Sequence, residues 1–403
     1  MISHKPRLAC PAPELDLIGA IVSADWSAGA RRQWPPSLFR GIDWAKFAAF
    51  AWQHKVRPMA ATALREAGWP GVPGEVREAL ERDARACTLK SIRQLEMQSA
   101  LGRVAAAAGI RFIAIKGLAL SAHLYGDPFI REAYDFDLLV SPEDTDRMKE
   151  ALRSIGLRPL VEKPPITSRQ KAILGRFFHE EKFVHPETGA MVDVHHALTG
   201  NPWRIATCLD DLWRRRQYVR IGGGELPIPG DADLIRYLGA HAAAHAWERW
   251  KWAGDLMVLY GRAASLDLPD QRRMARNEGW DDLFDSALLI TSAITGWDIP
   301  ADLGGSIAGN ANAARIARRA LNLSARPLSV HEITGRIREF RLAVFRLRLR
   351  KNPRHFAHEI ALLLHRPQDW YELRLSDSLI PAYYFLRPLL FIWRRIAGLG
   401  RSD

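Results

Sequence analysis

A change of hydrophobic periodicity near Gly109 constrains this fold more than any other feature of the sequence. Before it, apolar residues recur at helical spacing over residues 76–108. After it, short apolar segments typical of strands stand at 112–115 and 136–140. From Asp231 onward the helical pattern returns and continues through most of the chain. Strand signals confined between two helical regions predict an α+β protein.

Turn and cap residues divide the chain into individual elements. Lys116-Gly117 closes the first strand, and Gly126-Asp127-Pro128 separates the following helix from the second strand. Ser141-Pro142-Glu143-Asp144 combines a hydroxyl cap, a proline and two acids, which is typical of a helix start. Glycines 222–224 fit the tip of a hairpin. The pattern predicts helices at 43–67, 76–108, 118–125, 141–155, 234–247, 251–262, 268–278 and 280–291, and strands at 112–115, 136–140, 177–185 and 191–196.

The length of 403 residues exceeds what a single hydrophobic core usually supports. We therefore expect a helical N-terminal region at 1–108, a mixed-sheet core at 109–230 and a helical C-terminal domain at 231–403 that closes over the core. A hydrophobic content of 48% with 25% charged residues suits a globular protein of this kind.

Basic residues outnumber acidic ones by 57 to 45, which gives a formal net charge of +12. This balance favours anionic partners such as nucleotides, nucleic acid or an acidic membrane surface, and it equally suits a generally basic solvated surface. Arginines concentrate between Arg336 and Arg354, with apolar residues between them. That stretch predicts either an amphipathic element for RNA or a membrane, or a packed helix with a charged outer face.

Cysteine usage and the N-terminus indicate a cytoplasmic protein. Cys10, Cys87 and Cys208 are far apart and form no CxxC motif, so a disulfide framework or a cysteine zinc site is not expected. Residues 1–17 contain prolines and charges without an apolar stretch, so we expect no signal peptide. No run reaches the roughly 18 apolar residues of a membrane span.

Asp135 and Asp137 provide the clearest chemical signal. Residues two apart in a strand project from the same face, so both carboxylates leave the start of this strand together. Two carboxylates about 4 Å apart repel each other by roughly 1–4 kcal/mol, depending on the local dielectric. A divalent cation removes that repulsion, and carboxylate oxygens together with substrate phosphates are the ligands that Mg²⁺ prefers. A solvated strand end or a helix cap is the alternative interpretation.

The residues around this pair suit an anionic ligand. Gly117 lies between a strand and a helix, where it allows backbone N–H groups to approach phosphate, and the helix N-terminus adds positive potential. Lys116 and Arg131 could neutralise phosphate oxygens. The alternatives are an ordinary surface lysine at 116 and a structural ion pair between Arg131 and Glu132 or an aspartate.

These motifs resemble the nucleotidyltransferase superfamily, the polymerase-β-like group in which a glycine-containing strand–helix turn precedes Asp-x-Asp on the next strand. The segment is most similar to an uncharacterised bacterial nucleotidyltransferase family that has a Lys-Gly turn, a later arginine and an Asp-x-Asp-Leu-Leu-Val strand, here residues 135–140. The similarity continues at Val192-Asp193-Val194-His195, His241, His245, Trp250-Lys251-Trp252, Asp255, Asp369-Trp370 and Arg387-Pro388.

The resemblance implies a small mixed-sheet nucleotidyltransferase core and the transfer of a nucleoside monophosphate from an NTP to a hydroxyl of an unidentified acceptor. Asp135 and Asp137 would bind Mg²⁺, or Mn²⁺ in its place. Asp193 would complete the set as a metal ligand or base, unless it only orients His195 or faces solvent. Gly117 would shape the phosphate loop.

The sequence departs from the superfamily pattern at Leu118. Many members carry Gly-Ser or Gly-Gly in this turn, and their interval before the aspartates is shorter. The departure leaves open a catalytically inactive scaffold that has kept the fold. The basic C-terminal third leaves open a nucleic-acid-binding protein.

His241 and His245 lie four residues apart on one helix face, a spacing that can bind zinc. Ala242 stands where the HExxH motif needs glutamate, so a metalloprotease is not expected. Buried, hydrogen-bonded histidines are one interpretation, whereas the resemblance implies that His241, His245 and Lys251 line the nucleotide site. A plain i,i+4 ion pair would also explain Lys251 and Asp255.

Overall fold

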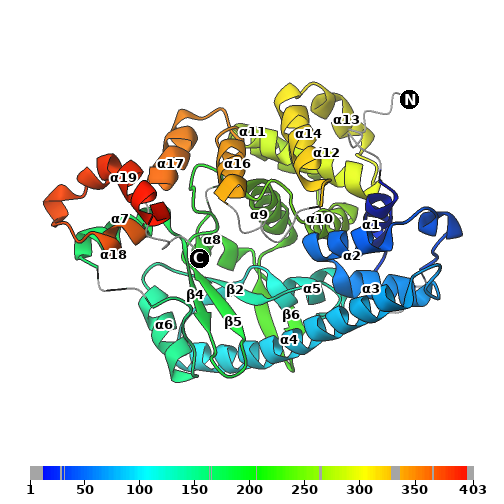
Figure 1. Cartoon of the computed structure of the whole chain (residues 1–403), viewed down its shortest axis with the longest axis horizontal. Coiled ribbons are helices and arrows are strands. Elements are labelled where there is room, and N and C mark those ends of the chain that lie inside the picture. Colours follow the sequence, from blue (N-terminus) through cyan, green and yellow to red (C-terminus); the bar gives the residue numbers. More distant parts are fainter. Residues whose placement is uncertain are drawn as a thin grey trace.

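The computed structural model of the chain describes residues 12–27, 30, 32–162, 164, 166–205, 207–262, 266–327, 336–364 and 367–396. Most of the N-terminal segment that we expect to lack a signal peptide falls outside these residues, as does Cys10. Figure 1 shows a central sheet with the long helix α4 (Gly74–Ala107) beneath it and a body of helices above it. The chain is therefore a mixed α+β protein, as its periodicity predicts.

The main sheet has five strands in the order β1-β2-β5-β4-β3. β2 runs parallel to β5, whereas the other neighbouring pairs are antiparallel. The two strands that carry the sequence motifs, β2 and β5, are therefore direct neighbours. The strand bounds are β1 (Phe112–Ala114), β2 (Asp135–Val140), β3 (Arg158–Pro159), β4 (Glu180–Val184) and β5 (Met191–His195).

The two faces of this sheet pack against different cores. On one face, Phe136 and Leu138 join a buried cluster with residues of α4 and α6 (Thr145–Ser154). On the other face, Leu139 belongs to the core of the helical body. Because side chains alternate along a strand, Asp135 and Asp137 share this second face with Leu139. The two aspartates therefore lie between the sheet and the helical body.

The helical body combines helices from both ends of the chain in one buried cluster. Gln53, at the end of α2, donates hydrogen bonds to the carbonyl oxygens of Ser324 and Arg326 at 3.2 and 3.1 Å. The helices that contribute to this core include α1 (Pro13–Ser23), α2 (Trp44–Gln53), α3 (Arg57–Glu66), α9 (Asp231–Ala244), α10 (Lys251–Gly261), α11 (Leu268–Asn277), α12 (Asp281–Thr295), α13 (Ala301–Ala308) and α14 (Ala311–Ser324).

Several predicted elements have different bounds in the structure, such as the helix expected at 234–247, which is α9 (Asp231–Ala244), and two of them differ in kind. The single helix expected at 43–67 is wrong, because Lys55 has a left-handed φ of 58° that separates α2 from α3. The strand expected at 177–185 begins only at Glu180. Phe177 instead ends α7 (Ser168–Phe177), which starts with a capping box between Thr167 and Gln170.

The hairpin expected around residues 222–224 is confirmed. β6 (Gln217–Ile221) pairs antiparallel with β7 (Gly224–Ile228), and Gly222 and Gly223 form the tip with φ of 60° and 77°. Two consecutive positive φ values are what a tight two-residue hairpin loop requires, and glycine adopts them without steric cost.

The remaining helices surround these parts. On the left of Figure 1, the C-terminal helices lie beside α7, where Trp370, Ile380 and Tyr383 pack against Ile173 and Leu174. The elements not yet given are η1 (Pro36–Phe39), α5 (Gly117–Tyr125), α8 (Leu209–Arg214), α16 (Arg336–Arg346), α17 (Pro353–Leu364), α18 (Pro367–Glu372), η2 (Asp377–Leu379) and α19 (Ala382–Ile396).

The basic stretch of the C-terminal third buries Leu342, Phe345 and Leu349 and exposes Arg341, Arg348, Lys351 and Arg354, whereas other arginines of the stretch bond to the protein. Arg338 bonds to the carboxylate of Glu248, with its Nε at 2.8 Å. Arg350 donates to backbone carbonyls, including that of Glu278 at 2.8 Å, and Arg354 lies over the ring of Trp203. These contacts favour the packed-helix interpretation over an exposed basic element for RNA or a membrane.

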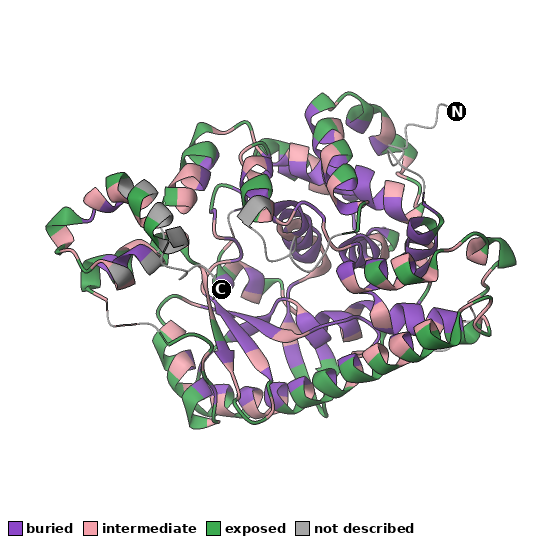
Figure 2. Cartoon of the chain, viewed as in Figure 1, coloured by how far each residue is buried: buried purple, intermediate pink, exposed green. Residues whose placement is uncertain are grey.

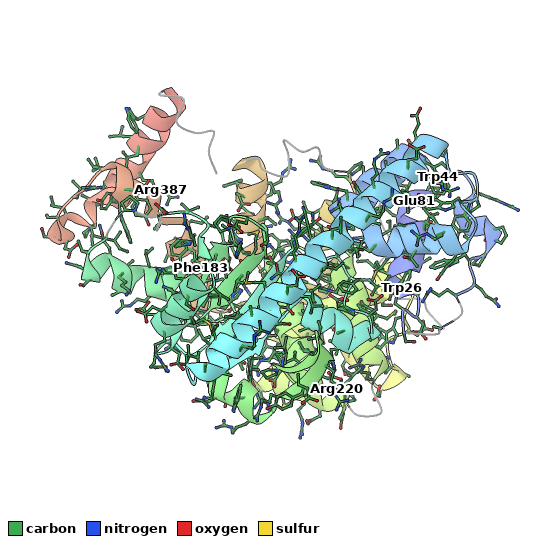
Figure 3. The ribbon with its side chains drawn as sticks, turned by 90° about the horizontal axis from the view of Figure 1, so that it is seen from below. Trp26, Trp44, Glu81, Phe183, Arg220 and Arg387 are labelled. Atoms are coloured by element: carbon green, nitrogen blue, oxygen red, sulfur yellow. The ribbon has the colours of Figure 1, made fainter. Side chains whose placement is uncertain are left out.

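Burial follows the layered arrangement. Figure 2 shows the strands of the sheet and α9 as largely buried, whereas α4 exposes the side that faces away from the sheet. Seen from below in Figure 3, α4 runs diagonally across the middle of the molecule. Within the described parts of the chain, no helix combines the length and hydrophobicity that crossing a bilayer requires.

Candidate functional site

Three strands bring one row of charged side chains together on the face beneath the helical body. Asp137 of β2 stands opposite Asp193 of β5, and Lys182 of β4 stands opposite Asp193 on the other side. Asp135 precedes Asp137 by two residues and shares its face. The site is therefore set by the register of the parallel β2–β5 pair.

Asp137 is buried, and two side chains bond to one of its carboxylate oxygens. Its side-chain Oδ1 accepts from Lys116 Nζ at 2.8 Å and from His195 Nε2 at 3.1 Å. Burial alone would raise the pKa of this carboxyl, but Lys116 and His195 outweigh it and hold the pKa well below its usual range. Since only 3% of Asp137 is exposed, the interpretation as a solvated strand end is wrong for this residue.

Asp193 is also buried but less completely paired. Lys182 bonds to its Oδ2, whereas its Oδ1 has no hydrogen-bond partner among the described residues. Burial and the nearby Asp135 raise the pKa of Asp193 to about 6. Asp193 therefore does not face solvent, and it carries an unsatisfied buried oxygen that calls for a ligand.

Asp135 lies half-buried at the start of β2. No hydrogen bond to its carboxylate is found among the residues that the structure describes. Burial, followed by the charge of Asp137, raises the pKa of Asp135. The three aspartates thus carry more negative charge than Lys116 and Lys182 neutralise.

The donor set suits a hard divalent cation. Ligand atoms of Asp137 and Asp193 lie within 4.8 Å of each other, beside His195, whose Nε2 bonds to Asp137. Carboxylate oxygens dominate this group, and the unpartnered Oδ1 of Asp193 is available to a metal. The residues present therefore fit the Mg²⁺ that the resemblance implies.

Gly117 holds the turn next to these carboxylates. It has a φ of +73°, and a Cβ atom at this position would lie 2.9 Å from the carbonyl oxygen of Asp135. Glycine is therefore required here both by the backbone conformation and by the close approach of β2. The preceding residue, Lys116, projects from this turn onto Asp137.

A cavity of about 340 Å³ opens beside this charged row. His241 of α9 and His245, the residue that follows its last turn, contribute to it with ring centroids 4.8 Å apart, and burial lowers the pKa of both imidazoles. The hypothesis that these histidines line a pocket is therefore compatible with their position. Other lining residues are Lys116, Phe177, Phe178, His179, Glu180, His195, Asn201, Arg204, Tyr237, Arg346 and Glu359.

Comparison with known proteins identifies the family. Residues 40–296 match a family described as an uncharacterised nucleotidyltransferase, which covers more than half of the chain. The chain belongs to that family. The match ends at Gly296, so it includes the sheet, α9 and α10. No curated protein and no solved structure matches the chain.

In this nucleotidyltransferase-family protein, Arg131 has a structural partner. Its Nε lies 2.9 Å from both carboxylate oxygens of Asp255, and Tyr125 also donates to Asp255 at 2.9 Å. Both Arg131 and Asp255 are buried. This contact favours the structural ion-pair interpretation of Arg131, with Asp255 as the aspartate partner, over phosphate binding.

Lys251 likewise has a partner within the protein, although its charge also acts on Asp135. Its Nζ donates to the carbonyl oxygen of Glu132 at 2.7 Å, and burial together with Arg131 and Arg249 keeps its pKa well below the usual range. The i,i+4 pair between Lys251 and Asp255 is wrong, because Asp255 bonds to Arg131 and Tyr125 instead. We therefore do not assign Lys251 to nucleotide binding.

Sequence reasoning missed four residues that the structure places at the site. Glu180 and Lys182 of β4, His179 just before it, and Tyr237 of α9 lie beside the aspartates or the cavity. The only available signal was the alternation of Glu180 and Lys182, which puts both on one face of a strand. Without the pairing of β4 and β5, that face could not be linked to Asp193 and His195.

Proposed function

We propose that this protein is a metal-dependent nucleotidyltransferase that moves a nucleoside monophosphate from an NTP to a hydroxyl group of an acceptor. The observation that supports this most directly is the register that sets Asp137 against Asp193 beside the half-buried Asp135. A Mg²⁺ or Mn²⁺ ion bound there would neutralise phosphate charge and orient the transferring group. Asp135, Asp137 and Asp193 are the residues that would hold it.

The other residues have separate tasks in this proposal. Gly117 brings the N-terminus of α5 close to β2. The backbone N–H groups of the first turn of α5, which no side chain caps, are then available to a phosphate. Lys116 and Lys182 balance the carboxylates in the free protein and could exchange to phosphate oxygens when nucleotide enters. The adjacent cavity, with Tyr237 and His241 in its wall, is where we place the nucleotide or its acceptor.

Calorimetric titration of the full chain with Mg²⁺ and each NTP, followed by an assay of pyrophosphate release, tests this function. We expect NTP binding that depends on the metal and pyrophosphate release that stops on chelation and returns with Mg²⁺ or Mn²⁺. A chain carrying Asp146→Asn is a matched control, because Asp146 is an exposed carboxylate on α6. Absence of metal-dependent NTP binding would contradict the proposal.

A second candidate is a catalytically inactive scaffold, and the lysine pairs favour it. The ammonium groups of Lys116 and Lys182 can neutralise Asp137 and Asp193 without a metal ion. Such pairs could let the fold persist after activity has been lost. The same experiments separate the two candidates, because NTP binding without pyrophosphate release with any acceptor in cell extract would favour the scaffold.

A further inference from the structure

His195 has one ring nitrogen that the carboxylate site does not use. Its Nε2 lies 3.1 Å from Asp137 Oδ1, and because a carboxylate only accepts, this nitrogen carries the proton. In the neutral ring, Nδ1 then has a free lone pair. Nδ1 is buried without a hydrogen-bond partner in the described chain, and it faces Glu180 Oε2 at 3.6 Å.

His179 completes a second group of ligand atoms. Its Nε2 lies 3.8 Å from the same Oε2 of Glu180, and the two imidazole rings stand 5.5 Å apart. One ligand atom each from His179, Glu180 and His195 falls within 4.8 Å of the others. Ligands about 2.1 Å from a tetrahedral ion are separated by about 3.4 Å, so these side chains need only small shifts to close on a metal.

From this geometry we propose that His179, Glu180 and His195 form a transition-metal site, suited to Zn²⁺, that is separate from the aspartate site. Two imidazoles with one carboxylate are softer ligands than the aspartates and prefer Zn²⁺ over Mg²⁺. Asp137 then supports the metal ligand His195 through its other ring nitrogen, as carboxylates commonly do in zinc proteins. Lys182 lies 3.4 Å from Oε1 of Glu180, which leaves Oε2 to the metal.

Three protein ligands leave a coordination position open. All three residues line the cavity of about 340 Å³, so the open position is accessible to whatever enters it. An open position is typical of catalytic zinc sites, whereas structural sites are closed by a fourth protein ligand. If the proposed transfer reaction holds, the acceptor hydroxyl is the group that would take this position, where the ion lowers its pKa.

Binding of Co²⁺ and Zn²⁺ to the chelator-treated full chain tests the site without any nucleotide. We expect one equivalent of Co²⁺ with the visible absorption of nitrogen ligands, and its displacement by Zn²⁺. His179→Ala and Glu180→Gln should each weaken Co²⁺ binding by about 100-fold or more, since even the loss of a supporting residue costs about 10–100-fold. Thermal unfolding checks that each variant is folded. If His179→Ala does not fold, the Co²⁺ affinity of Glu180→Gln tests the site.

Two control variants define the outcomes. His196→Ala removes a neighbouring imidazole whose Nε2 bonds to the carbonyl of Gly175, and Asp135→Asn removes a carboxylate of the other site. Both should keep Co²⁺ affinity. The proposal is overturned if the wild-type chain takes up no Co²⁺, or if Asp135→Asn loses it while His179→Ala keeps it. Because no NTP is present, this result does not depend on whether the transferase function is correct.

Discussion

Two carboxylates that lie three residues apart, the buried Glu132 and the half-buried Asp135, differ in how far the protein compensates their charge. Glu132 bonds to Arg57 at 2.9 and 3.0 Å and lies 3.6 Å from Lys55. These cations hold the pKa of Glu132 below its usual value despite burial. Three residues later, Asp135 has no such partner, and burial with Asp137 raises its pKa.

This difference distinguishes a carboxylate that stabilises the fold, Glu132, from carboxylates that are available to a ligand, Asp135 and Asp193. Burying an ionised carboxylate is costly unless hydrogen bonds and opposite charges compensate for lost water. Glu132 receives that compensation from the protein, and its partners tie α3 to the start of β2. Nearby lysines compensate the charge of Asp135 only in part, so its pKa stays raised. The Oδ1 atom of Asp193 has no hydrogen-bond partner in the described chain. The variants with the largest expected effects therefore change activity at Asp135 and stability at Glu132.

The strongest expected effect is on activity at Asp135. Asp135→Asn should lower NTP-dependent pyrophosphate release by about 1,000-fold, because it removes a cation ligand where phosphate charge is stabilised. Denaturant unfolding should show unchanged or slightly higher stability, since the variant relieves repulsion with Asp137. Full activity in this variant, measured beside Asp146→Asn, would end the assignment of the site.

The opposite result is expected at Glu132. Glu132→Gln should lower the free energy of unfolding by about 3 kcal/mol, because Lys55 would lose its carboxylate and Arg57 would keep only the more exposed Asp83. Chemical denaturation measures this loss. A change of less than about 0.5 kcal/mol would show that the two carboxylate groups do not differ in the way described here.

A smaller effect is expected at the glycine turn that packs against Asp135. Gly117→Ala should cost about 2 kcal/mol, because alanine is strained at a φ of +73° and its Cβ meets the carbonyl oxygen of Asp135. Displacement of Asp135 should also reduce activity. Gly175→Ala in α7 is the matched control, since a Cβ there has open space and alanine favours a helix. Equal unfolding midpoints for the two variants would contradict this role for Gly117.

The smallest effect at any single pH near neutrality concerns His54, a buried group that burial keeps uncharged there. It lies between Phe50 and Trp250, and burial lowers its pKa to about 3. A lowered histidine pKa means that the unfolded chain binds more protons, so stability is full above about pH 6.5 and falls as pH drops toward 3. His54→Phe should flatten that fall by at most about 1.4 kcal/mol per pH unit, measured by denaturation at several pH values. An unchanged slope would show that His54 does not titrate as described.

Local patterns in the sequence were sufficient to place the aspartates but not their neighbours. The two-residue spacing of Asp135 and Asp137 predicts a shared face, and the apolar run after them predicts a strand. The opposition of Asp137 and Asp193 depends on strand register, which single-sequence patterns do not contain. Arg131 shows the same limit, because its partner Asp255 is 124 positions away and nothing near Arg131 identifies it.

Element bounds followed a similar rule. Glycines with a necessary backbone conformation, such as Gly222 and Gly223, marked their hairpin correctly. The break between α2 and α3 was missed because Lys55 is not a residue that usually adopts positive φ. Its conformation is set by tertiary contacts, including those of its ammonium group with Glu132 and the ring of Trp52.

The shared core of the helical body has a kinetic consequence. Gln53 finds its carbonyl partners 271 and 273 residues further along the chain. During synthesis, the contacts of Gln53 in α2 can therefore form only after Arg326 has left the ribosome. Contacts of such long sequence separation slow folding and leave apolar side chains exposed in the meantime. We expect assistance by chaperones to matter more for this protein than its ordinary composition suggests.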